Sequence, residues 1–184
     1  MSNIKIIMIP GNGGGTSSIS WFNYIKEHMF VYGIEVVIKN FPDPELARKE
    51  YWFPYLDKLG VDENTILIGH SSGAVAAMKY AESHQILGSI LVSACYTDLG
   101  IEEERLSGYY DDEWKWDLIK NNQKWIAQFH STDDPFIPIE EARYIHKMLD
   151  TEYYEYNDQE HFGIYKPKLD FPEIIDILKK RLNL

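Results

Sequence analysis

The chain has 184 residues, of which 45% are hydrophobic and 14% aromatic, enough to fill the core of one domain and too many for a disordered chain. Acidic residues outnumber basic ones by 29 to 18, and the formal net charge of −11 disfavours binding to nucleic acid or to a negatively charged membrane surface. The single cysteine excludes an internal disulfide, and the apolar stretch before Pro10 is too short for a secretory signal or a membrane span. We therefore expect one domain over residues 1–184 and a cytoplasmic location.

Short apolar segments alternate with segments of helical spacing along the whole chain. The apolar segments predict six strands, at residues 5–10, 34–39, 65–69, 86–92, 124–129 and 152–156. The helical spacing predicts helices at residues 19–30, 45–59, 72–83, 113–120, 140–149 and 172–182. Several strands are almost continuously apolar, which is typical of parallel strands covered by helices on both faces. The pattern predicts an α/β fold with a mostly parallel sheet, whose chemistry lies in the loops after the carboxyl ends of the strands.

One such loop carries a candidate nucleophile. The string Gly69-His70-Ser71-Ser72-Gly73 follows the third predicted strand and precedes an alanine-rich helical segment. It is a G-x-S-x-G motif in the strand–turn–helix context that the motif requires. Its register selects Ser71 as the nucleophile, and the backbone N–H of Ser72 would then face the developing oxyanion. The alternative interpretation is a glycine- and serine-rich helix cap without chemistry.

A serine nucleophile needs a base, and His161 is the best placed of six histidines. His161 lies in a polar loop directly after the last predicted strand. The side chain of His70, within the turn, is expected to point away from the Ser71 hydroxyl. The other histidines lie in helical segments or at the end of a helix or strand: His28, His84, His130 and His146.

The orienting acid has two main candidates. Asp133 and Asp134 both lie in the loop after the fifth predicted strand, and either could instead cap a turn before Pro135. Asp98 and Asp158 are weaker rivals. With either main candidate, the chain order is serine, aspartate, histidine, which is the order of α/β hydrolases.

The glycine-rich loop at residues 10–15 follows the first predicted strand and could supply a second oxyanion donor. We predict that this donor is the backbone N–H of Asn12, with Gly13 next. A phosphate-binding loop is the rival interpretation, but the segment lacks a Gly-Lys-Ser/Thr ending. No metal or cofactor is expected, because the chain has no H-E-x-x-H motif and only one cysteine.

A segment rich in aromatic residues runs from Tyr96 to Trp116. Tyr109 and Trp116 are our candidates for substrate binding, since aromatic side chains here could line a pocket over the nucleophile. The alternative is that they cover the edge of the sheet. Cys95 is expected to be a small buried hydrophobic residue and not a reactive thiol.

A resemblance to a known family is carried by seven segments, at residues 10–15, 41–44, 69–74, 91–94, 107–109, 131–136 and 160–162. From residue 4 to about residue 180, the chain resembles the family of small serine hydrolases typified by the retinoblastoma-binding serine hydrolase, with bacterial relatives. The resemblance implies a minimal α/β-hydrolase fold without a large cap domain, with six strands in the order 2-1-3-4-5-6. It matches Ser71 and His161 to the nucleophile and base and Asp134 to the acid, which leaves Asp133 as a turn or support residue.

Two positions depart from the family pattern. The family member that provided the name has an L-x-C-x-E string used to argue for retinoblastoma-protein binding, and here Val61 stands at the cysteine position of the segment 59–63. Retinoblastoma protein is therefore not an expected partner. Glu160, directly before His161, stands where the family can have glycine, which leaves the histidine available.

Together, these residues predict a serine hydrolase that acts through an acyl-enzyme on a small carboxylic ester or an amino-acid-like amide. The alternative is a protein-interaction module that keeps the hydrolase fold with little or no turnover. The presence of all three triad side chains favours the enzyme, because a binding module has no need for them together.

Overall fold

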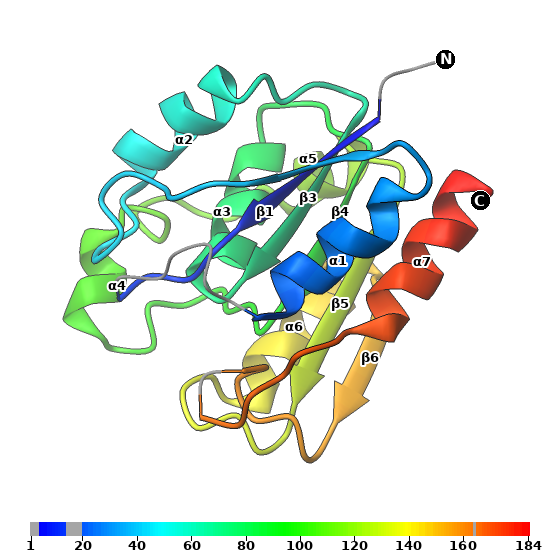
Figure 1. Cartoon of the computed structure of the whole chain (residues 1–184). Helices are drawn as coiled ribbons and strands as arrows, with labels where there is room; N and C mark the ends of the chain where they lie inside the picture. The colour runs from blue at the N-terminus through cyan, green and yellow to red at the C-terminus, as the bar shows by residue number, and fades with distance from the viewer. Residues whose placement is uncertain (1–3, 14–19, 164) are drawn as a thin grey trace.

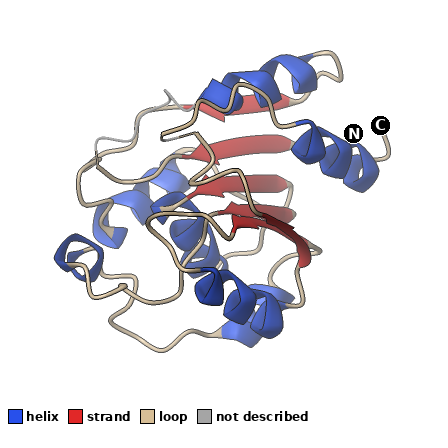
Figure 2. Ribbon diagram, turned by 90° about the horizontal axis from the view of Figure 1, so that it is seen from below, coloured by secondary structure: helices blue, strands red, loops and turns tan. Residues whose placement is uncertain are grey.

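Six parallel strands form one sheet in the order β2-β1-β3-β4-β5-β6 in the computed structural model, which describes residues 4–13, 20–163 and 165–184 (Figures 1 and 2). Each of the five neighbouring pairs is parallel, so the predicted topology is confirmed. Parallel pairing brings the carboxyl ends of all strands to one edge of the sheet. The strands are β1 (Lys5–Ile9), β2 (Glu35–Ile38), β3 (Thr65–His70), β4 (Gly88–Val92), β5 (Ile126–Ser131) and β6 (Glu152–Tyr156).

Helices cover both faces of the sheet, as the apolar strands predict (Figures 1 and 2). Successive side chains of a strand point to opposite faces. Ile6 and Met8 of β1 therefore pack in one hydrophobic cluster with α1 (Ser20–Phe30) and α7 (Pro172–Leu182). Ile7 and Ile9 pack in the other cluster, with four helices. These are α2 (Lys49–Lys58), α3 (Ser72–Ala81), α5 (Trp116–Asn121) and α6 (Ile139–Leu149).

The connection between β4 and β5 contains a short helix that the sequence analysis did not predict. This helix, α4 (Glu102–Leu106), has three glutamates in its first turn and no buried residue, so it lacks the apolar stripe that identifies a helix. It lies at one end of the molecule, away from the sheet (Figure 1). Only α4 and α5 occur between β4 and β5, and no large cap domain covers the strand ends within the described residues.

Most element ends differ from the prediction by a few residues, for identifiable reasons. β5 continues through His130 and Ser131 because both pair with β6, although polar residues at this point indicate a loop. α2 begins at Lys49 and not at residue 45, since Asp43 and Ala47 adopt positive φ in a turn before it. The predicted start of the first helix, at residue 19, lies outside the described residues. None of the described helices is both long and apolar enough to span a membrane.

Candidate active site

A cavity of about 470 Å³ opens at the carboxyl ends of the strands. Its lining includes four residues that the sequence analysis selected, namely Asn12, Ser71, Ser72 and His161. Loops that are far apart along the chain therefore converge here, as the parallel sheet requires.

Ser71 occupies a tight turn between β3 and α3 with φ 55° and ψ −125°, a conformation that few non-glycine residues adopt. Its backbone N–H donates to the Val92 carbonyl at 2.9 Å. The flanking glycines are required by close backbone packing. A Cβ at Gly69 would lie 2.3 Å from the Gly73 carbonyl oxygen, and one at Gly73 would lie 2.3 Å from the Ile9 carbonyl oxygen. The turn around Ser71 can therefore pack this tightly only because Gly69 and Gly73 have no side chains.

This packing predicts a large effect of Gly73→Ala. The added methyl group forces α3 away from β1, so we expect the free energy of unfolding in urea to fall by about 3–5 kcal/mol. Gly100→Ala is the control, because nothing lies within 4 Å of its added Cβ, although its φ of 72° adds a conformational cost that Gly73 does not have. The control should lose only the conformational cost, about 1–2 kcal/mol. Equal losses in the two variants would contradict the tight packing of α3 on β1.

His161 is held by an aspartate on the neighbouring loop. Its Nδ1 lies 2.8 Å from Oδ2 of Asp134, whose carboxylate is completely buried. The same Oδ2 accepts from the Ser93 hydroxyl at 3.0 Å. Oδ1 accepts the backbone N–H groups of Phe136 and Ile137 at 2.9 and 3.1 Å. The carboxylate is therefore fixed by four contacts, each with a group that can donate a hydrogen bond.

Asp133 makes different hydrogen bonds from those of Asp134. Its Oδ1 accepts the Ser131 hydroxyl and, at 2.9 Å, the backbone N–H of Glu160. These bonds tie the loop after β5 to the loop that carries His161. Asp134, not Asp133, is thus the aspartate that contacts the His161 ring.

The environment of Asp134 favours its charged form. Burial by itself disfavours the carboxylate, but the hydrogen bond and charge of His161 and the two backbone N–H groups outweigh it, so the pKa of Asp134 is lowered. Asp134 is then ionised at neutral pH and accepts a hydrogen bond from Nδ1–H of His161. This orientation leaves Nε2 of the ring as the atom that can accept a proton from elsewhere.

A second histidine, His70, contacts His161. His70 is buried, and its Nε2–H donates to the backbone carbonyl of His161 at 2.8 Å. The two rings pack edge to face with centroids 4.8 Å apart. Burial, with a smaller contribution from the His161 charge, lowers the pKa of His70 to about 3, so this ring is neutral in the folded protein.

The lowered pKa of His70 predicts acid sensitivity. An unfolded histidine titrates near pH 6.5, so between about pH 6.5 and pH 3 the unfolded chain binds one more proton than the folded protein. Stability is therefore lost as pH falls through this window, by up to about 1.4 kcal/mol per pH unit. We expect His70→Gln, which keeps a donor for the His161 carbonyl, to reduce that slope in urea unfolding series. His28→Gln, which removes an exposed histidine, is the control, and equal slopes in both variants would contradict this prediction.

The structure does not bring the two predicted substrate contacts, Tyr109 and Trp116, to this cavity. Tyr109 is completely buried in the core, with its ring centroid 6.2 Å from that of Phe53. Trp116 stacks on Trp114 at 5.1 Å. Neither lines the cavity, because the aromatic segment folds down against the helices and not over Ser71.

Residues of two loops, after β4 and after β5, form the apolar part of the lining instead: Leu99, Ile101, Phe136 and Ile137. The sequence analysis did not select these four residues. They nevertheless lie in the loops after the carboxyl ends of β4 and β5, which is where the sites of such sheets occur. Cys95 also lines the cavity and is buried, and burial raises the pKa of its thiol, as expected for an unreactive cysteine.

The glycine-rich loop reaches the cavity through Gly11, Asn12 and Gly13, whereas Gly14 and Gly15 lie outside the described residues. The backbone N–H of Gly13 donates to the Glu45 carbonyl at 3.3 Å. The side-chain amide of Asn12 donates to Glu104 of α4 at 2.7 Å. Glu104 is a site residue that the sequence analysis did not identify.

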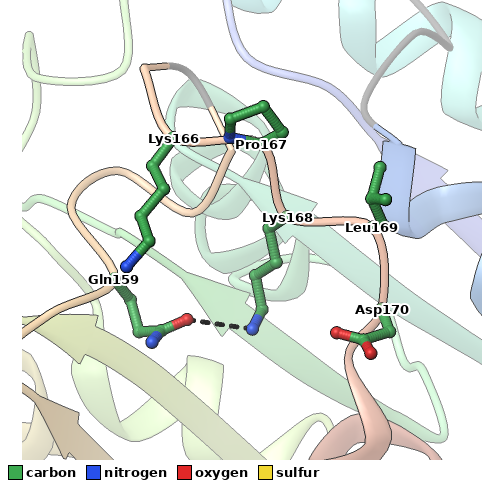
Figure 3. A pocket seen from close by; sticks show the side chains of 6 residues that line it. All are labelled: Gln159, Lys166, Pro167, Lys168, Leu169 and Asp170. Carbon is green, nitrogen blue, oxygen red and sulfur yellow. Dashed lines mark hydrogen bonds between the residues drawn. The ribbon is translucent and has the colours of Figure 1, made fainter.

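A second pocket, of about 320 Å³, lies beside the chain segment that precedes α7 (Figure 3). Lys168 donates from Nζ to Oε1 of Gln159 at 3.0 Å across it, and Pro167 and Leu169 complete part of the wall. Neither Ser71 nor His161 lines this pocket. Among the described residues there is also no group of three or more histidine, cysteine or acidic side chains that could hold a metal ion.

The six-stranded parallel sheet, with a strand–turn–helix serine at the ends of its strands, defines the fold as that of an α/β hydrolase. A family model described as serine hydrolase matches residues 6–180. The chain is 44% identical to serine hydrolase RBBP9 of Rattus norvegicus over 185 residues, which covers 99% of this chain and 97% of the rat protein. The chain belongs to the serine hydrolase family, and the resemblance drawn from its motifs is confirmed.

Solved structures agree on the fold. The crystal structure of the ydeN gene product from Bacillus subtilis is 25% identical, with a TM-score of 0.87, over 98% of this chain and all of that one. Est1E from Butyrivibrio proteoclasticus with bound ferulic acid has a TM-score of 0.75 at 14% identity, covering 98% of this chain and 90% of that one. The protein is therefore a serine hydrolase with the α/β-hydrolase fold.

Proposed function

We propose that this serine hydrolase cleaves small carboxylic esters or amino-acid-like amides with Ser71 as nucleophile, His161 as base and Asp134 as orienting acid. The observation that carries the proposal is the 2.8 Å contact between His161 Nδ1 and the buried Asp134 carboxylate, beside a cavity that both Ser71 and His161 line. We also propose that residues 1–184 act as a single domain, because both hydrophobic clusters share the one sheet. No metal or cofactor takes part in this mechanism.

The reaction proceeds in two halves. Nε2 of His161 takes the proton of Ser71 as Oγ attacks the carbonyl carbon, and the resulting tetrahedral intermediate collapses with transfer of that proton to the leaving alcohol or amine. A water molecule then gives a proton to Nε2 and attacks the acyl-enzyme. Release of the carboxylic acid restores the Ser71 hydroxyl, while Asp134 stabilises the imidazolium in both halves.

The backbone N–H groups of Asn12 and Ser72 are the proposed oxyanion donors, each contributing about 3–4 kcal/mol to transition-state stabilisation. Ser72 begins α3, so its N–H points out of the helix N-terminus. The bond from the Gly13 N–H to the Glu45 carbonyl supports Asn12 as the second donor, because it engages the neighbouring N–H elsewhere.

The cavity supports a small substrate with an apolar part. Its volume of about 470 Å³ falls within the range of ordinary small-molecule sites. The apolar side chains of Leu99, Ile101 and Phe136 line it, so burial of a hydrocarbon group against them would supply binding energy.

The direct test is covalent labelling with a fluorophosphonate, read by intact mass and peptide mapping. We expect one adduct per molecule of folded protein, on Ser71. Ser83→Ala, an exposed serine beyond the far end of α3, is the matched control and should label like the wild type. Failure of the folded wild type to react would contradict an activated serine and favour an interaction module on the hydrolase fold.

A further inference from the structure

The carboxylate of Glu104 reaches into the active-site cavity from α4. It is half-buried, whereas the residues on either side of it, Glu103 and Arg105, are exposed. Its Oε1 accepts the side-chain amide of Asn12 at 2.7 Å and lies 3.4 Å from the Ser72 hydroxyl. A single oxygen atom therefore contacts the side chains of the two residues whose backbone N–H groups form the proposed oxyanion hole.

Asn12 and Ser72 come from different parts of the chain, so other contacts must fix the position of one relative to the other. Asn12 lies between Gly11 and Gly13, which give the loop little rigidity of its own. Ser72 is fixed by α3. The distance between their N–H groups must nevertheless hold to within a fraction of an ångström, because oxyanion stabilisation depends on preorganised donors. The bond of Asn12 to Glu104 ties the loop to the helix side of the site.

Glu104 is itself held firmly. Its Oε2 accepts the Tyr110 hydroxyl at 3.3 Å, and its backbone carbonyl accepts the hydroxyl of Ser107, which is buried. The carbonyl of Ser107 in turn accepts the backbone N–H of Lys49 at 2.8 Å, which ties the end of α4 to the start of α2. These hydrogen bonds therefore hold both the Glu104 carboxylate and the end of α4 in place.

Burial disfavours the charged form of the Glu104 side chain. Burial raises the pKa of Glu104, although the hydrogen bonds from Asn12, Tyr110 and Ser72 oppose this shift. The proposed triad does not use Glu104. A half-buried acid with three donors directed at it is instead suited to holding those donors in place.

We propose that Glu104 is a positioning residue that sets the oxyanion hole by joining the Asn12 loop to Ser72 at the start of α3. This inference rests on the proposed function. It predicts that loss of the carboxylate weakens transition-state stabilisation more than substrate binding.

The test compares kcat and KM for p-nitrophenyl acetate in Glu104→Ala, Glu104→Gln and Glu102→Gln. For Glu104→Ala we expect kcat to fall about 10- to 100-fold, with KM changing much less, because misplaced donors cost transition-state stabilisation. Glu104→Gln keeps an oxygen acceptor for Asn12 and should recover most of kcat. Glu102→Gln removes an exposed carboxylate of the same helix that does not line the cavity, and it should match the wild type.

A double-mutant comparison isolates the contact. Asn12→Ala keeps the backbone N–H but removes the amide that Glu104 accepts. If the contact positions the loop, then Asn12→Ala combined with Glu104→Ala should be no slower than the worse single variant. The inhibition constant of an aryl trifluoromethyl ketone, whose adduct places an oxyanion in the hole, should rise in proportion to the loss of kcat/KM.

The inference is overturned if Glu104→Ala keeps kcat within about 2-fold of the wild type, less than the loss of any positioned donor. An equal loss of kcat in Glu104→Ala and Glu104→Gln would also overturn it. So would a double variant whose loss of kcat is the product of the losses in Asn12→Ala and Glu104→Ala. Urea unfolding of each variant shows that the measured protein is folded, and Glu104→Gln and Asn12→Ala remain as tests if Glu104→Ala does not fold. Absence of turnover and labelling in the wild type would reject the proposed function itself, which is a separate result.

Discussion

Ser71→Ala is expected to lower kcat for p-nitrophenyl acetate by about 10⁵–10⁶-fold, with the protein still folded. The hydroxyl makes the covalent bond in the proposed mechanism, and a methyl group cannot replace it. Alanine has a smaller side chain than serine and keeps the Cβ, so it fits the turn at φ 55° with little change in strain. His161→Ala should lose a similar factor, and the double variant should be no slower than either, because the two groups act as one unit.

Steady-state kinetics with fluorophosphonate labelling checks this result. Ser83→Ala again serves as the control, since it removes a hydroxyl beyond the other end of α3. Retention of more than about 1% of the wild-type kcat in Ser71→Ala would exclude the covalent role of this serine, since loss of a triad nucleophile costs far more.

Asp134→Asn is expected to lower kcat by about 10⁴-fold while leaving the site's geometry in place. The backbone N–H groups of Phe136 and Ile137 donate to Oδ1, so the carbonyl oxygen of an asparagine would occupy that side. Its NH₂ group would then face His161 Nδ1 and donate to it. The ring would carry its proton on Nε2, where it cannot accept the proton of Ser71.

Asp133→Asn is the matched control, because it makes the same change one residue earlier. Asp133 bonds to Ser131 and to the Glu160 backbone and not to the His161 ring, so we expect less than about a 10-fold loss of kcat and about 1 kcal/mol of stability. The second measurement is the pH dependence of kcat/KM in both variants, which reports the pKa of the base in the free enzyme. A larger loss in Asp133→Asn than in Asp134→Asn would assign the acid to Asp133.

Much of the fold could be predicted because its signals are local. β6 and α7 have the predicted bounds, since the aromatic run of one and the apolar stripe of the other end where the elements end. The G-x-S-x-G turn could be located for the same reason, because Gly69, Ser71 and Gly73 constrain one another within five residues. α4 was missed because its residues carry no apolar periodicity, and its position depends on contacts with distant segments.

By itself, the sequence determined the strand–helix alternation, the G-x-S-x-G turn and the loops that carry the candidate base and acid. These depend on apolar periodicity and on residues close together along the chain. The spacing along the chain left Asp133 and Asp134 open, and only the family resemblance favoured Asp134. The tertiary structure shows that Asp134 contacts His161, because the hydrogen bonds around Asp134 orient its carboxylate. It also decided that Tyr109 is buried in the core and that Glu104 meets Asn12, 92 residues away in the chain. Such contacts follow from how the layers pack, and no local pattern of residues encodes them.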